Sequence, residues 1–236
     1  MNIYLYVSWA DRIEAPDGFD VFKHFDTDEE AAIKEKANYD AQGFHTLLYK
    51  TAGTSSALIT EKLLSYSMES IAFIVFHEAF HVHLSRSDCK IHYLFEEATG
   101  DIIGNYGSML FAVCNKLLKP NLSKRQTSLN EHLYHFINET VQKISKSNVQ
   151  QFFGIYQGCN AKIGKLLKEG TAFQKDRFGY EVNNAYLLRN RYYGENYFLL
   201  RSLFQKMKSM AEFVRFMSDL PVDLDLAKVE IRKALR

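Results

Sequence analysis

The chain has 236 residues, of which 47% are hydrophobic, and this is enough apolar surface to build a substantial core. Its net charge of +1 gives no general attraction to nucleic acid or to an anionic membrane surface. The three cysteines are odd in number and irregularly spaced, so they do not predict a disulfide framework.

The apolar runs are too short to predict a membrane span, because none exceeds about six residues against the roughly 18 that a span needs. Residues 1–7 have no basic residue and no small-residue cleavage site, so they do not predict a signal peptide. We therefore expect a cytoplasmic protein, or a periplasmic or exported one if a leader was removed.

The first part of the chain predicts a small sheet with flanking helices. Residues 3–7 alternate between apolar and polar side chains, as in a strand. Residues 28–42 predict a helix, with acidic residues in the first turn and a glycine after its end. A second strand is expected at 44–50 and a helix at 58–67.

Gly53 and Thr54 follow the second predicted strand and have two interpretations. An extended peptide can bind against an edge strand, and a glycine there permits close backbone approach. Alternatively, the segment is an ordinary turn from a strand into a helix.

Residues 69–85 predict a buried helix that carries the motif His-Glu-x-x-His at His77, Glu78 and His81. Histidines four residues apart share one helix face, so both rings can reach a single Zn²⁺ at about 2.0–2.1 Å. Glu78 can then act as the general base for a zinc-activated water. The alternative is a pair of core histidines bonded to backbone carbonyls. The apolar run 71–76 makes unpaired polar groups costly here, and a metal would pair them.

Residues 94–118 predict a second apolar helix with carboxylates near its start. Catalytic zinc needs a third protein ligand and an open position for water, and we expect Glu97 to be that ligand. Asp101 lies on the same face and would accept a hydrogen bond from one of the two histidines. Glu96 is an alternative ligand, and both glutamates could instead be solvated residues that favour a helix start. Cys89, in the loop between the two helices, is a stray ligand or a free thiol.

The remainder of the chain predicts further helices. A polar loop is expected at 120–130, two helices at 129–167, and two or three more from residue 181 onward. The fold class is therefore α+β and predominantly α-helical. We expect a single domain over residues 1–236, with the small sheet and the zinc helices in 1–120 and a helical half in 121–236.

The motif followed by Glu97 on the next helix is the gluzincin arrangement of zinc peptidases, and the chain resembles the predicted bacterial zinc aminopeptidases. Three blocks carry the resemblance, at residues 28–56, 74–98 and 183–216. It implies a zincin-like core, a Zn²⁺ cofactor and a peptide substrate. The chain departs from the family pattern at Val82, Glu96, Gly100 and Asp101, which bears on the substrate preference more than on the metal.

The third block implies further roles. Gluzincins stabilise the oxyanion with a tyrosine or histidine from a later helix, and Tyr193 matches the tyrosine of the family, with Tyr186 next. A half-buried packing tyrosine is the alternative for Tyr193. Asn183 and Asn184 would bond the substrate backbone, or cap a helix.

We therefore expect a zinc-dependent peptide-bond hydrolase, in particular an aminopeptidase, with no nucleic-acid partner. One alternative is a zincin-like endoprotease that cleaves a specific protein partner. The other is an inactive zinc-binding scaffold or regulator, and the intact Glu78 argues against it because a scaffold needs no general base.

Overall fold

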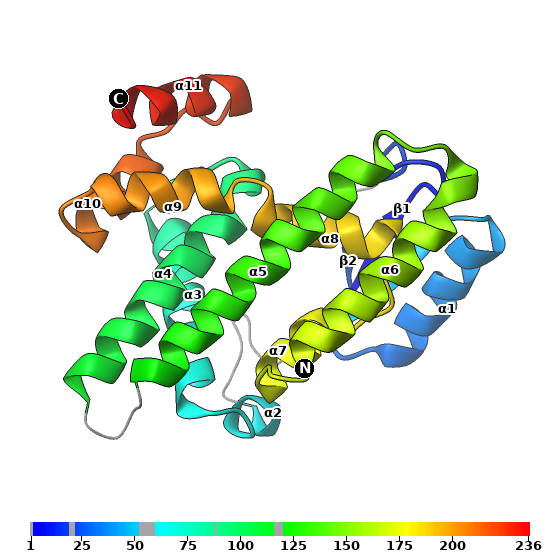
Figure 1. The fold of residues 1–236 in the computed structure, drawn as a ribbon, viewed down its shortest axis with the longest axis horizontal. Coiled ribbons are helices and arrows are strands. Elements are labelled where there is room, and N and C mark those ends of the chain that lie inside the picture. The colour runs from blue at the N-terminus through cyan, green and yellow to red at the C-terminus, as the bar shows by residue number, and fades with distance from the viewer. Residues whose placement is uncertain (1, 19–21, 52–59, 88, 116–119) are drawn as a thin grey trace. The chain divides into compact units, whose positions relative to one another are not determined.

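The computed structural model describes residues 2–18, 22–51, 60–87, 89–115 and 120–236. The fold is α+β and predominantly α-helical, with one small antiparallel sheet, as the sequence predicts (Figure 1). The chain forms two compact units, each made of two stretches: Met1–Ser67 with Arg125–Arg191, and Met68–Lys124 with Tyr192–Arg236. The units interleave along the chain, unlike the consecutive parts 1–120 and 121–236 that the sequence suggests.

The first unit contains the sheet, whose strands are β1 (Asn2–Ser8), β2 (Lys23–His24) and β3 (His45–Thr51). β1 is central and pairs antiparallel with both others, so that Leu5 lies opposite Leu48. Helix α1 (Glu29–Ala41) packs on the sheet and ends before Gly43, whose φ of +83° suits a residue without a side chain. The strands predicted at 3–7 and 44–50 and the helix predicted at 28–42 are confirmed.

The other helices assigned wholly or mostly to this unit are α2 (Glu61–Leu64), α5 (Pro120–Ile144), α6 (Val149–Leu167), α7 (Ala172–Phe178) and α8 (Asn184–Gly194). The loop predicted at 120–130 is wrong, because α5 begins at Pro120. The side chains that face the protein interior near the start of α5 are polar. The Nε2 of Gln174 donates to the carbonyl of Gln126 (3.0 Å) and to the Oδ1 of Asn130 (2.8 Å). Tertiary hydrogen bonds therefore take the place of the apolar stripe by which a helix is recognised.

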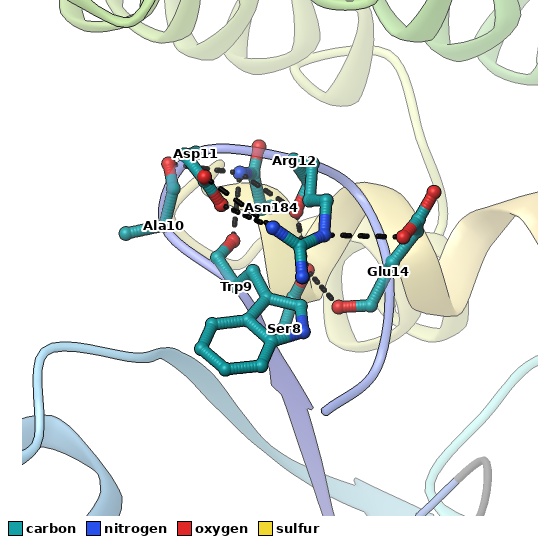
Figure 2. Close-up of polar contacts among 7 residues, drawn as sticks. All are labelled: Ser8, Trp9, Ala10, Asp11, Arg12, Glu14 and Asn184. Atoms are coloured by element: carbon teal, nitrogen blue, oxygen red, sulfur yellow. Dashed lines mark hydrogen bonds and ion pairs between the residues drawn. The ribbon is translucent and has the colours of Figure 1, made fainter. Parts of the chain in front are cut away.

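A polar cluster around the buried side chain of Asn184 fixes the loop that follows β1 (Figure 2). The side-chain amide of Asn184 donates to the carbonyls of Trp9, Ala10 and Arg12 at 2.9–3.2 Å. Its Oδ1 accepts a hydrogen bond of 2.6 Å from the hydroxyl of Tyr156. Because every polar group of this amide has a partner, its complete burial carries little net desolvation cost. We call these residues the Asn184 cluster.

The outer edge of β3 is covered by side chains from the segment before α8. Asn183 donates from its Nδ2 to the carbonyl of Thr46 at 3.0 Å, and the hydroxyl of Tyr180 accepts from the backbone N–H of Lys50 at 3.5 Å. An exposed strand edge can pair with another chain, and these contacts occupy two positions along it.

The second unit is helical in its described residues and contains α3 (Met68–Arg86), α4 (Tyr93–Cys114), α9 (Tyr197–Lys206), α10 (Met210–Ser218) and α11 (Leu224–Ala234). α3 matches the helix predicted at 69–85, and α4 ends at Cys114, within the predicted range 94–118. α9 packs on α4, where Asn105 donates to the hydroxyl of Tyr197 at 3.0 Å. Among the described residues, each helix is too short or too polar for a membrane span.

α3 and α4 pack antiparallel with close backbones, since Gly100 faces His77 and Gly104 faces Phe73. Three glycines of α4, spaced four and three residues apart, face α3. A Cβ at Gly104 would lie 2.9 Å from the carbonyl oxygen of Phe73, and one at Gly107 would lie 2.4 Å from the ring of Phe76. Such distances leave no room for a side chain, so glycine is required for this packing.

Candidate metal centre

The candidate metal centre lies in the second unit, where α3 passes the start of α4. His77, Glu78 and His81 come from the middle of α3, as predicted. Glu96, Glu97 and Asp101 come from the first turns of α4, which is capped by His92, whose Nδ1 accepts from the backbone N–H of Leu94. Acidic side chains are favoured at this end of a helix by its positive partial charge.

Three possible ligand atoms converge between the helices. The Nε2 atoms of His77 and His81 lie 3.1 Å apart. The carboxylate of Glu97 is 3.3 Å from the first of these nitrogens and 3.7 Å from the second. One ligand atom from each residue lies within 4.8 Å of the other two, which is the size of site that can hold one metal ion. Glu97, which the sequence predicts as the third ligand, thus lies beside both histidines.

The outer nitrogens of the two rings each face a further carboxylate. The Nδ1 of His81 lies 2.9 Å from an oxygen of Glu96, and the Nδ1 of His77 lies 3.0 Å from an oxygen of Asp101. The His77 ring is turned so that its N–H does not point directly at that oxygen, and the nitrogen is buried. Pairing of Nδ1–H with a carboxylate leaves Nε2 as the atom that can bind a metal.

This geometry fits a bound cation. If both Nδ1 atoms carry protons, the two Nε2 lone pairs face each other at 3.1 Å, and such an arrangement needs a proton or a cation between them. Two imidazoles and one carboxylate are also the ligand set of catalytic zinc sites that keep a fourth position open. The residues present therefore fit Zn²⁺.

The carboxylates strongly affect the protonation of both rings. Burial lowers the pKa of His77, but the nearby carboxylates of Asp101 and Glu97 outweigh it and raise the pKa to about 10. Burial likewise lowers the pKa of His81, while the hydrogen bond to Glu96 and the charge of Glu97 produce a net rise. Without a metal, a proton held by the rings compensates part of the negative charge around them.

Glu96 has a role that the sequence reasoning missed. It was considered as an alternative ligand or a solvated residue, whereas its oxygen pairs with the outer nitrogen of His81. The sequence does contain a signal, because residues 96–101 hold three carboxylates. One metal ligand and one outer partner would account for only two of them. Which carboxylate meets which nitrogen depends on how α4 is rotated against α3.

The two tyrosines considered as oxyanion donors belong to different units. Tyr193 is half-buried in the last turn of α8, in the same unit as the metal centre, and its role stays a prediction. Tyr186 belongs to the first unit, where its fully buried hydroxyl donates to the carbonyl of Phe178 at 3.1 Å. Burial also raises the pKa of this hydroxyl.

The two asparagines belong to the first unit. Asn183 caps α8, since its Oδ1 accepts from the backbone N–H of Tyr186 at 2.9 Å, and this agrees with the capping interpretation. Asn184 is the centre of the Asn184 cluster. Gly53 and Thr54 lie outside the described residues.

Comparisons with protein-family models, with curated proteins and with solved structures give no match. The observations on the chain itself therefore define its class: a predominantly helical α+β protein with a partly buried His-His-Glu group that could hold a metal ion. The zincin-like core and the resemblance to zinc aminopeptidases stay predictions from the sequence.

Proposed function

We propose that the protein is a zinc-dependent peptide-bond hydrolase whose metal ligands are His77, His81 and Glu97. One observation carries the proposal: three ligand atoms converge within 4.8 Å, and the two histidines among them are each backed by a further carboxylate. Carboxylate–histidine pairs are the usual outer partners of metal-binding histidines. The sequence motif around Glu78 adds the general base that a purely structural zinc site lacks.

The proposed roles follow from the position of each residue. A bound zinc ion would supply Lewis-acid activation of water and of the substrate carbonyl. Glu78, which follows His77 on α3, accepts the proton of the attacking water and returns it to the leaving amine. Glu96 accepts from the Nδ1–H of His81, and Asp101 faces the Nδ1 of His77 at 3.0 Å, so that the Nε2 atoms keep their lone pairs for the metal. The charge of Glu78 also acts on the His81 ring, as expected of neighbours in this site.

The test separates the metal ligand from the base. Glu97→Ala removes a ligand and should weaken zinc binding. Glu78→Gln should retain zinc and lose hydrolysis, because an amide cannot accept the proton. Zinc content and the hydrolysis of aminoacyl-arylamides and of an internally quenched peptide are measured for both variants and for the unsubstituted protein.

The two substrates also distinguish an aminopeptidase from an endoprotease. Activity on the arylamides alone supports an aminopeptidase, which the sequence resemblance favours, and activity on the quenched peptide alone supports an endoprotease. A zinc-loaded protein that cleaves neither would contradict the proposal. Loss of zinc in Glu78→Gln but not in Glu97→Ala would mean that the two roles are exchanged.

Tyr193 is the proposed donor to the oxyanion, and Tyr193→Phe removes its hydroxyl with almost no change in packing volume. Loss of one oxyanion donor lowers kcat by about 10²–10³, so the variant should keep zinc and fold normally but turn over slowly. Nearly normal turnover would show that Tyr193 only contributes packing.

A further inference from the structure

The edge of the His77 ring that carries its two nitrogens lies directly against the backbone of α4. A Cβ built on Gly100 would lie 2.9 Å from Cε1, 3.0 Å from Nδ1 and 3.3 Å from Nε2 of this ring. These three atoms form the whole edge that faces α4. The ring therefore occupies the place where any other residue at position 100 would have its side chain.

The neighbours of Gly100 on α4 explain why the ring must lie so close. Glu97 and Asp101 are four residues apart and share the helix face on which Gly100 lies between them. The Nε2 of His77 is 3.3 Å from Glu97, and its Nδ1 is 3.0 Å from Asp101. One ring can meet both carboxylates only if it approaches the helix between them, where a side chain would stand in the way.

We propose that Gly100 is a positioning residue of the metal centre, and that its missing side chain allows His77 to meet Glu97 and Asp101 at once. This inference rests on the proposed metal site. A methyl group at position 100 would push the ring edge away from α4 by several tenths of an ångström. Metal–ligand distances tolerate only about ±0.2 Å, so a displaced ring binds zinc poorly.

Other glycines of the chain provide matched controls. Gly104 lies one turn later on the same face of α4, and a Cβ there would meet the ring and the carbonyl oxygen of Phe73, which is not a metal ligand, at 2.9 Å. Gly164 in α6 has no atom within 4 Å of such a Cβ, so Gly164→Ala reports only the effect of alanine on helix stability.

The experiment measures the zinc dissociation constant and the thermal unfolding midpoint of the metal-free protein for Gly100→Ala, Gly104→Ala and Gly164→Ala. Disturbing the residues that orient a metal-bound histidine typically costs about 10- to 100-fold in metal affinity, and we expect Gly100→Ala to weaken zinc binding by this factor. Gly104→Ala should mainly lower the unfolding midpoint. Gly164→Ala should leave the zinc affinity unchanged and raise the thermal unfolding midpoint slightly.

Two results would overturn the role of Gly100. One is zinc affinity in Gly100→Ala equal to that of the unsubstituted protein. The other is an equal loss of affinity in Gly104→Ala, which would make the overall spacing of α3 and α4 responsible. Failure of the unsubstituted protein to bind zinc is a separate outcome that contradicts the proposed function itself.

A second measurement needs no variant and so does not depend on Gly100→Ala folding. In the unsubstituted metal-free protein, the Hε1 proton of His77 should show a nuclear Overhauser effect to the Hα protons of Gly100, because Cε1 lies against that backbone. Its absence in a folded sample would overturn the proposed placement of the ring.

Discussion

The Asn184 cluster and the metal centre are both polar and partly buried, but their hydrogen-bonding groups balance differently. In the Asn184 cluster, one amide lies among three carbonyls and a hydroxyl, and its donors and its acceptor all have partners. In the metal centre, three carboxylates surround two imidazoles whose Nε2 atoms face each other at 3.1 Å. The first cluster is complete within the protein, whereas in the second the carboxylates raise the pKa of both rings and so favour a proton or a cation there.

This difference separates a structural polar cluster from a candidate binding site. A buried polar group with all its hydrogen bonds made stabilises one conformation of the chain. A group in which carboxylates favour a proton on neighbouring histidines can instead take up a metal ion in place of that proton, and perturbed pKa values of this kind cluster at functional sites. The comparison predicts that substitutions at the two clusters affect different properties, namely metal binding at one and stability at the other.

The largest expected effect is the loss of metal binding when a histidine is removed. His77→Ala or His81→Ala leaves two protein ligands, which is too few to hold zinc at a site of this kind. We expect zinc, measured by elemental analysis after dialysis, to fall from about one per chain to none. Retention of zinc in either variant would place the metal elsewhere, and Asn184→Ala is the control that should keep it.

The second expected effect is a loss of stability when Asn184 is replaced. Asn184→Ala removes the side-chain donor to the carbonyls of Trp9 and Ala10 and the acceptor for the hydroxyl of Tyr156, and we expect the free energy of unfolding to fall by about 3 kcal/mol. Urea denaturation measures this change. The comparison fails if Asn184→Ala loses zinc while its stability is unchanged.

A smaller effect is expected at Glu96, the outer partner of His81. Glu96→Ala removes the acceptor of the Nδ1–H group and should weaken zinc binding by about 10- to 100-fold. Glu96→Gln retains a hydrogen-bond acceptor but not the charge, so it should weaken zinc binding less than Glu96→Ala does. Competition with a zinc chelator measures both constants. An unchanged affinity in Glu96→Ala would mean that this contact does not orient the ring.

The last prediction concerns the pH dependence of zinc binding and needs no substitution. The folded-state pKa of His77 is raised from 6.5 to about 10, so its proton stabilises the metal-free fold fully below pH 6.5 and less as the pH rises toward 10. Zinc must displace this proton, and its affinity should therefore increase with pH over the same interval. Calorimetric titration at pH 7.5 in buffers of different ionisation enthalpy should detect release of about one proton per zinc. Binding without proton release would contradict the protonation of His77.

Local pattern predicts much of this protein, but not the contacts between distant segments. The helix that carries His77 and His81 follows from its apolar run, and Glu97 and Asp101 follow from their spacing on the next helix. The pairing of Glu96 with His81 does not follow from the sequence, because it depends on the rotation of α4 against α3. The sequence predicts a loop where α5 begins, because the groups there that bond Gln174 are polar and form no apolar stripe. Asn184 likewise bonds the loop after β1, more than 170 residues earlier in the chain.

X-ray absorption at the zinc edge, on protein loaded with one equivalent of Zn²⁺, tests the central claim most directly. The account predicts nitrogen and oxygen ligands at about 2.0–2.1 Å, with the multiple-scattering signal of two imidazoles and no sulfur. Failure to take up zinc would contradict the account. So would a sulfur ligand at about 2.3 Å, which would implicate a cysteine such as Cys89 in place of the His77, His81 and Glu97 site.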